Sequence, residues 1–321
     1  MNSYKSRPLI GAVLGVFTIL VFAVFVISAS VSAAQSTVNL RTAEPFAILS
    51  GTPNITDAGN NSVIQGDVGL SPATGSGIGL LCSQVTGTIY SVDATGPLPC
   101  RVTNGPLMVT AKNHLTAAYD DAAGRTPVTT VPTELGGTTK IAGVYDSGST
   151  RFDITAGAGA LVLDGQNDPS SVFIFQAGFN GMGLTVGPGS AISLVNGAQA
   201  CNVFWRVDTA SIDTTANFKG TILALNSISV ANGATIEGRL LARNGNVTLI
   251  NDTITVPTCS DDSGNDSSSG GNGSGSGSDT PGFPNTGSQS ESSVPWAAVL
   301  TLVVIALLGS GLYVARKKHR I

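Results

Sequence analysis

The feature that most constrains the fold is a short repeat. The pattern apolar-x-Gly-x-apolar begins four times in the chain, at Ile64, Val85, Phe218 and Ile236. The last two copies are 18 residues apart and consist only of strand and turn signals. A repeat of this length and composition is typical of one coil of a parallel β-helix, in which each coil stacks on the next. The repeat therefore predicts a β-solenoid whose apolar side chains point inward and whose polar side chains point outward.

The likeness between the last two copies extends beyond the pattern. Ala224 and Asn226 match Ala242 and Asn244, and after a slip of one residue the triplet 228–230 matches the triplet 247–249. The alternatives are a chance match between glycine-rich segments and a β-sandwich. A sandwich needs hairpin turns between alternating runs, whereas the turns here recur at the length of a coil.

Composition agrees with a chain of short strands joined by tight turns. Charged residues make up 11% of the chain, against about 25% in an average soluble domain, and 40 of the 321 residues are glycine. The formal net charge is only −4, and the central region has no cluster of lysine and arginine. The sequence thus argues against a helical bundle and against nucleic acid as a partner.

One segment has the periodicity of a helix. Thr103 or Asn104 can cap its start, Pro106 suits its first turn, and Gly124 suits its end. Apolar residues recur at three- and four-residue steps, at Leu107, Ala111, Leu115, Ala118 and Ala122. We expect one long helix that packs against something large.

The N-terminus has the features of a secretory signal peptide, which we assign to residues 1–34. Lys5 and Arg7 precede an almost wholly apolar stretch at 9–27, and small residues follow at 31–34. The apolar stretch is also long enough for an uncleaved membrane anchor, which is the alternative. Both interpretations place residues 35–259, the expected folded domain, outside the cytoplasm.

Four cysteines in an exported chain favour disulfides over metal binding. Three pairings are possible, and we favour Cys82–Cys100 with Cys201–Cys259 because each pair closes a separate region. The chain has no CxxC motif and only two histidines, so we expect no structural zinc site and no other cofactor.

The C-terminal part has the layout of a surface anchor. Residues 260–282 form a Gly/Ser/Asp-rich linker without a core. Phe283-Pro284-Asn285-Thr286-Gly287 then precedes an apolar run at 294–314 and a basic tail. Residues 283–321 resemble an LPxTG sortase sorting signal, with phenylalanine in place of leucine, and the resemblance implies cleavage between Thr286 and Gly287. It implies sortase and cell-wall peptidoglycan as partners, with the 294–314 segment in the membrane before processing. A plain C-terminal membrane anchor is the alternative.

Three further stretches resemble a known family: the turn and strand at 165–176, the segment from Asn196 to Trp205, and the segment from Ala117 to Pro127. The family is the microbial ice-binding proteins, and the resemblance covers roughly residues 43–258. It implies a discontinuous right-handed β-solenoid of triangular section with one long helix alongside. It also implies that an ice crystal surface is the partner.

Binding ice needs a flat, rigid, weakly charged wall with regularly repeated hydroxyl and methyl groups. Stacked strands repeat every 4.7–4.9 Å or so, and threonine has a stiff χ1. Two sets of residues are candidates. The first is the outward residue of apolar-Ser/Thr-apolar triplets, at Thr185, Ser193, Ser229 and Thr248. The second, which resembles the Thr-x-x-Thr/Asn arrangement of the family and is preferred, is Thr214, Asn217, Asn232 and Thr235. Threonine and serine are also common on any exposed strand.

The sequence gives little support for an enzyme or a calcium protein. Asp120 and Asp121 are neighbours on the expected helix and diverge by about 100°. Asp164 and Asp168 flank a turn, where aspartate bonds to the backbone. No Ser/His/Asp or Cys/His set and no EF-hand spacing is apparent. His114 lies on the expected helix, where we expect a residue of the surface or of the edge of the core and not a catalytic base.

The prediction is a non-enzymatic, cell-wall-anchored ice-binding protein. The alternative is a surface adhesin or structural scaffold on the same fold, which would bind a polysaccharide or another cell. Family resemblance is stronger evidence for a fold than for a function.

Overall fold

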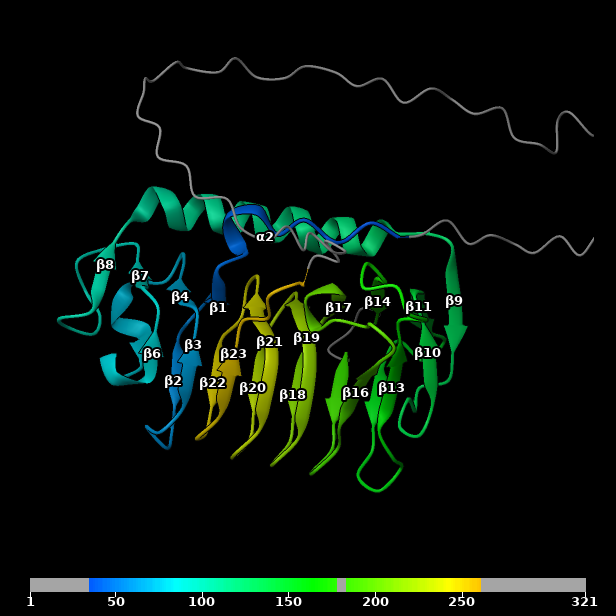
Figure 1. Ribbon diagram of the computed structural model, residues 1–321. Coiled ribbons are helices and arrows are strands. Elements are labelled where there is room, and N and C mark those ends of the chain that lie inside the picture. Colours follow the sequence, from blue (N-terminus) through cyan, green and yellow to red (C-terminus); the bar gives the residue numbers. More distant parts are fainter. Residues whose placement is uncertain (1–34, 178–182, 261–321) are drawn as a thin grey trace, which may run out of the picture. The chain divides into compact units, whose positions relative to one another are not determined.

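The computed structural model describes residues 35–177 and 183–260. The predicted signal peptide, nearly all of the predicted linker and the predicted sorting signal lie outside these residues. The described chain is mainly β with one α-helix, as predicted (Figure 1). No helix of the described residues has both the length and the apolar character needed to cross a membrane.

The largest sheet in the described part of the chain has 13 strands, all paired in parallel. Ten of them lie side by side. In spatial order they are β8 (Arg101–Thr103), β7 (Ile89–Ser91), β4 (Asp67–Leu70), β1 (Phe46–Ser50), β21 (Thr235–Ala242), β19 (Asn217–Ala224), β17 (Val203–Val207), β14 (Phe173–Gln176), β11 (Gly143–Ser147) and β9 (Val128–Val131). The other three are β23 (Thr253–Thr255), β3 (Val63–Gln65) and β6 (Val85–Thr86).

Two further parallel sheets complete the stack of described strands. The seven-stranded sheet runs β12 (Phe152–Ile154), β15 (Leu184–Val186), β18 (Ala210–Ile212), β20 (Ile228–Val230), β22 (Val247–Leu249), β2 (Ile55–Asp57) and β5 (Ile78–Gly79). The three-stranded sheet runs β10 (Thr139–Ile141), β13 (Leu161–Asp164) and β16 (Ile192–Val195). Short 3₁₀ turns lie at Arg41–Ala43, Gly75–Gly77, Cys82–Gln84 and Ala200–Asn202.

The repeated glycine marks a close approach between neighbouring coils. Phe218 pairs with Ile236 and Gly220 with Gly238, in the register expected from the 18-residue spacing. A Cβ atom on Gly238 would lie 1.9 Å from the carbonyl oxygen of Gly220, so no larger residue fits there. The first residue of β19, Asn217, bridges to Ala191 just before β16, and the second half of β19 pairs with β17. In the same way, the first half of β21 pairs with β23 and its second half pairs with β1. One strand therefore contributes to two sides of the stack.

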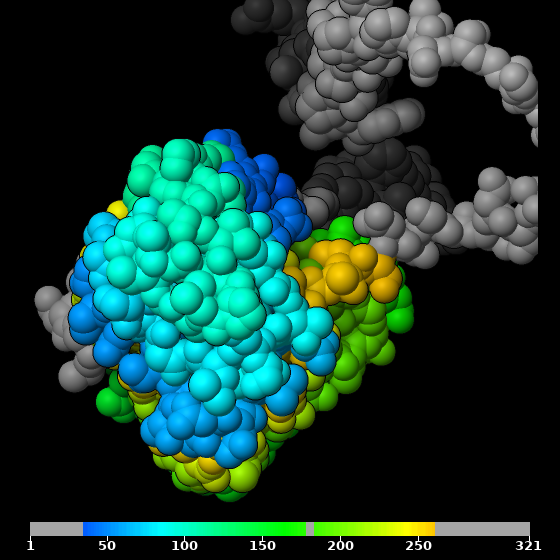
Figure 2. All heavy atoms as spheres, turned by 90° about the vertical axis from the view of Figure 1, so that its left-hand side faces the viewer, coloured from blue at the N-terminus to red at the C-terminus, as the bar shows by residue number. Residues whose placement is uncertain are grey.

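The order of the coils does not follow the chain. β1 lies between β4 and β21, so the N-terminal coils stack on the C-terminal coils. After β8 the chain leaves that end of the stack through helix α2 (Gly105–Gly124) and re-enters at β9, the opposite edge (Figure 1). Figure 2 looks along the stack onto the β8 end, where the cyan and blue-green segments cover the ends of the coils.

The helix begins and ends where the sequence predicts. The side chain of Asn104 accepts a hydrogen bond from the amide of Leu107, and proline occupies the first turn. The buried side of α2 includes Met108, Ala111, Leu115 and Ala118, which pack on the outer face of the ten-stranded row of strands. This contact forms a second core, separate from the interior of the coils.

Aromatic rings fill the interior of the coils. Tyr145, Phe175 and Trp205 occupy one register position on neighbouring strands, and the ring centroids of Phe175 and Trp205 are 4.1 Å apart. Phe152 approaches Trp205 edge-on from the seven-stranded sheet. Two disulfides close the regions that we expected them to close, Cys82–Cys100 and Cys201–Cys259.

Candidate functional site

The stack offers three strand-bearing sides, and the helix removes one of them from consideration. Helix α2 and the segment around Val38 and Leu40 pack on the ten strands from β8 to β9. Of the described strands, those of the seven-stranded sheet carry no helix on their outer side (Figure 1). A flat surface for binding a large object therefore has to lie away from α2.

The seven-stranded sheet carries a regular row of hydroxyl groups, which we call the hydroxyl row. The parallel register places one outward residue of each strand beside the next: Thr185, Ser211, Ser229, Thr248 and Thr56. Each is the middle residue of a three-residue strand whose flanking side chains are buried. Neighbouring hydroxyls are therefore spaced by the strand separation of about 4.8 Å.

The hydroxyl row is uncharged between its ends. At one end its register continues to Asp153, which forms an ion pair with Arg151 at 2.6 Å, and at the other end it continues to Gly79. Such a row presents hydroxyls, with threonine methyls among them, to solvent without the strong hydration of charged groups.

A shallow hollow flanks the hydroxyl row on each side. One, of about 380 Å³, is bounded by Thr185, Ser211 and Ser229 together with Thr209 and Ser227, and Arg151 lies at its charged end. The other, of about 340 Å³, is bounded by Ser211, Ser229, Thr248 and Thr56 together with Asp213 and with small or apolar residues such as Ala58 and Ala231. The two hollows share the row as a common wall, so ordered water can line both sides of it.

Ser193 is not part of this row, contrary to the sequence-based grouping with Thr185, Ser229 and Thr248. It lies in β16 of the three-stranded sheet, beside Val162 of β13. The triplet around Ser193 has the same pattern as the others, but the turn at Gly187–Ser190 carries the chain onto another side of the stack first. A triplet pattern cannot distinguish one side of a coil from another.

The preferred second set straddles a corner. Asn217 and Thr235 are paired neighbours, and the pair continues to Thr253. Thr214 and Asn232 precede a turn in which Thr215 and Gly233 adopt positive φ angles of 57° and 78°. In each coil the turn and the buried alanine after it separate the two members of the set, so each pair spans a corner of the coil.

Charge also distinguishes this corner from the hydroxyl row. Two residues beyond Asn217 and Thr235, Lys219 and Glu237 form an ion pair at 2.8 Å on the outward side of the same strands. The seven-stranded sheet has no such pair at the centre of its outer face, among the described residues.

Two buried carboxyl groups stabilise the corner where the N-terminal coil stacks on the last coil. Asp57 accepts bonds from the amides of Ser62 and Asn251, and Asp252 from those of Ala234 and Ile250. Burial raises the pKa of Asp252 to about 6. Burial also disfavours the charged form of Asp57 and so acts to raise its pKa. The hydrogen bonds that its carboxylate accepts outweigh burial, and the pKa of Asp57 lies below its usual value.

Sequence reasoning missed Ser211 and Thr56. Ala210-Ser211-Ile212 does fit the triplet pattern, but alanine is a weak apolar signal. Ile55-Thr56-Asp57 does not fit, because the inward residue is the buried aspartate of the corner. Only the strand register reveals both residues.

The carboxylates weighed as catalytic groups have structural partners instead. Asp120 and Asp121 form ion pairs with Arg243 and Arg125, and Asp164 accepts a bond from the amide of Gln166 within its turn. His114 lies 2.6 Å from the hydroxyl of Thr42. Among the described residues no three metal-binding side chains come together.

Comparisons with known proteins agree with the fold. A model of the ice-binding-like family matches residues 48–255. The chain is 40% identical to an ice-binding protein of Flavobacterium frigoris over 224 residues, which are 68% of this chain and 76% of the relative. It is 34% identical to an ice-binding protein of Flammulina populicola over 75% of this chain and 97% of that one.

Solved structures similar to this one are also ice-binding proteins. An ice-binding protein from an Antarctic biological consortium is 35% identical, with a TM-score of 0.60 over 71% of this chain and 94% of that chain. A domain of Shewanella frigidimarina ice-binding protein 1 is 29% identical, with a TM-score of 0.62 over 70% and 99% of the two chains. These relatives are ice-binding proteins rather than enzymes. The chain belongs to the ice-binding-like family.

Proposed function

We propose that this protein binds ice through the seven-stranded sheet, with the hydroxyl row of Thr185, Ser211, Ser229, Thr248 and Thr56 at the centre of the contact. The observation that carries the proposal is the unbroken register of these five side chains. Family membership supports ice as the partner.

The chemistry of the row suits water in a lattice. Hydroxyl groups at a fixed spacing hold water molecules at a fixed spacing, and threonine keeps its hydroxyl and methyl in one rotamer. Ordered water can also occupy the two hollows that run beside the row on the same surface. Since the strands are held by a packed aromatic interior, the surface does not have to become ordered on binding, which would cost entropy.

The second candidate function is a surface adhesin or scaffold on the same fold. Ice-affinity partitioning of the purified full chain separates the two. We expect most of the protein to enter slowly grown ice while a non-binding carrier protein stays in the liquid. If the chain stays in the liquid fraction with the carrier, the ice-binding function is wrong and the adhesin is favoured.

We further propose that the protein is displayed on a bacterial cell wall through the sorting signal at 283–321. The Phe-Pro-Asn-Thr-Gly order, the apolar run and the basic tail support this. In a host with a sortase, the wild-type chain should be released from cells by a muramidase, and the Thr286→Val variant should remain in the membrane fraction. Recovery of the wild-type chain in the membrane fraction alone would favour the plain anchor.

We infer, finally, that the coils form the right-handed β-solenoid of triangular section implied by the family resemblance. Three parallel sheets with continuous registers and the placement of β1 against β21 support it. A crystal structure of the protein would test both the handedness and the section.

A further inference from the structure

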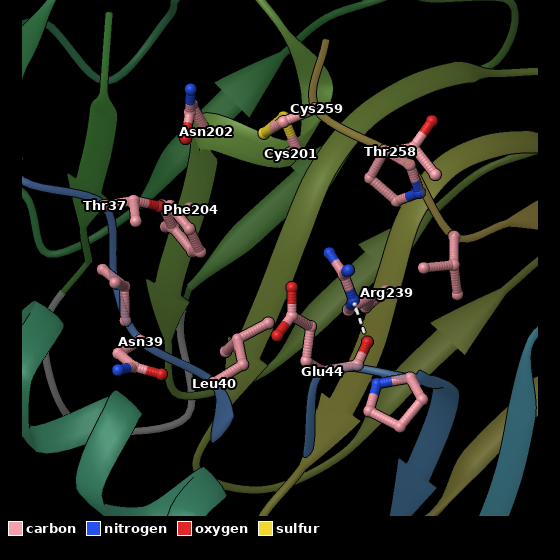
Figure 3. Close-up of a pocket in the computed structure, with 14 residues that line it drawn as sticks. Thr37, Asn39, Leu40, Glu44, Cys201, Asn202, Phe204, Arg239, Thr258 and Cys259 are labelled. Carbon is pink, nitrogen blue, oxygen red and sulfur yellow. Dashed lines mark hydrogen bonds between the residues drawn. A yellow bond between two sulfur atoms is a disulfide. The ribbon is translucent and has the colours of Figure 1, made fainter. Parts of the chain in front are cut away.

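A larger hollow, of about 850 Å³, lies where the two ends of the folded chain meet. It is bounded by the segment around Thr37–Pro45, by the start of β17, by Arg239 of β21 and by the segment from Val256 to Cys259 (Figure 3). It shares no lining residue with the hollows beside the hydroxyl row. The disulfide between Cys201 and Cys259 holds the C-terminal segment at its edge.

Arg239 is a fixed donor in this hollow. The residue is only 4% exposed, its Nε donates to the backbone oxygen of Glu44 at 2.7 Å, and its Nη1 donates to the hydroxyl of Thr221 at 3.3 Å. Its Nη2 has no partner among the described residues. Figure 3 shows the guanidinium pointing into the hollow. Three of its five N–H donors thus have no partner in the described part of the chain and can bond to a ligand or water in the hollow.

Asn202 is the matching acceptor. It is 7% exposed, and its Nδ2 donates to the backbone oxygen of Pro169 at 3.2 Å, which fixes the orientation of the amide. Its Oδ1 accepts no hydrogen bond from the described residues and belongs to a residue that lines the hollow. Figure 3 places Asn202 and Arg239 on different sides of the space. The hollow thus has a preset acceptor and a preset donor.

Glu44 adds a carboxylate to the same hollow. None of the four ion pairs among residues 35–177 and 183–260 includes Glu44 or Arg239. A free anion would gain from Arg239 but would be repelled by the Glu44 carboxylate, and an apolar ligand would desolvate both charges. A neutral group that both donates and accepts satisfies all three polar side chains.

We propose that this hollow binds a short, uncharged saccharide. Sugar hydroxyls can accept from Arg239 and donate to Glu44 and Asn202, while the C–H face of the ring can pack on Pro45, Val256 and Pro257. The volume is large enough for a ligand of one or two sugar rings. This site is separate from the proposed ice-binding surface and does not depend on it.

Titration of the purified full chain with maltose, cellobiose and N,N′-diacetylchitobiose, followed by saturation-transfer NMR, tests the proposal. We expect at least one disaccharide to bind with a Kd of about 0.1–10 mM. Preference for the diacetylated sugar would indicate an amino-sugar glycan, and preference for the other two a neutral glucan. Acetate and inorganic phosphate should bind more weakly than the preferred sugar.

Two exposed positions supply the variants. Thr258→Trp fills the rim of the hollow, and Glu44→Gln removes the carboxylate but keeps the backbone oxygen that holds Arg239. Both should weaken sugar binding at least tenfold and leave thermal hysteresis unchanged, whereas Ser229→Tyr should leave sugar binding unchanged. The proposal is overturned if no disaccharide binds, if Thr258→Trp binds as well as the wild type, or if phosphate binds more tightly than every sugar.

Discussion

Replacing Ser229 with tyrosine is expected to remove most of the thermal hysteresis activity, at least tenfold at equal protein concentration. Ser229 lies in the middle of the hydroxyl row, between Ser211 and Thr248, and borders both hollows. A phenol ring there projects well beyond neighbours that are about 4.8 Å away, so a flat crystal face can no longer touch them. Thermal hysteresis and inhibition of ice recrystallisation measure the loss.

The matched control is Thr235→Tyr. Thr235 is also an exposed strand residue, but it lies at the corner with Asn217 and beside the Lys219–Glu237 ion pair. We expect this variant to keep most of its activity, and both variants to keep the melting temperature of the wild type because neither side chain is buried. The reverse result, activity lost in Thr235→Tyr and kept in Ser229→Tyr, would place the contact at the corner and not on the seven-stranded sheet.

Much of the fold was predictable because the coils repeat at a nearly constant length. The spacing of 18 residues gave the pairing of Phe218 with Ile236, and the one-residue slip gave the pairing of Ser229 with Thr248. The helix was predictable from Asn104, Pro106 and Gly124, since capping and termination depend on local chemistry. The right-handedness and the triangular section that we propose for the stack came only from the family resemblance.

The site was less predictable because a binding wall depends on which side of the coil a residue occupies. Thr185, Ser229 and Thr248 do share one row, but Ser193 has the same local pattern and lies in another sheet. Non-consecutive stacking hid Thr56 as well, since its neighbour Thr248 is 192 residues away in the chain. No local sequence pattern predicts the contact between Thr56 and Thr248.

Replacing Trp205 with alanine is expected to cost about 3–5 kcal/mol of the free energy of unfolding. The indole is fully buried, stacks on Phe175 at 4.1 Å between ring centroids and donates from Nε1 to the backbone oxygen of Lys219 at 3.1 Å. Its removal leaves a cavity between two sheets and takes away the indole hydrogen bond to Lys219. Urea unfolding followed by circular dichroism gives the free energy.

Trp205→Phe separates packing from hydrogen bonding. Phenylalanine keeps a ring against Phe175 but loses the donor to Lys219, so we expect a loss of about 1–2 kcal/mol. A cost for Trp205→Ala no larger than that of Trp205→Phe would show that the aromatic interior does not hold the coils together. Phe152 contacts Trp205 from inside the stack, and its neighbour Asp153 lies at the end of the hydroxyl row. We therefore expect the Trp205→Ala variant to lose thermal hysteresis even while it is still folded. The flatness of the outer wall depends on the packing directly behind it.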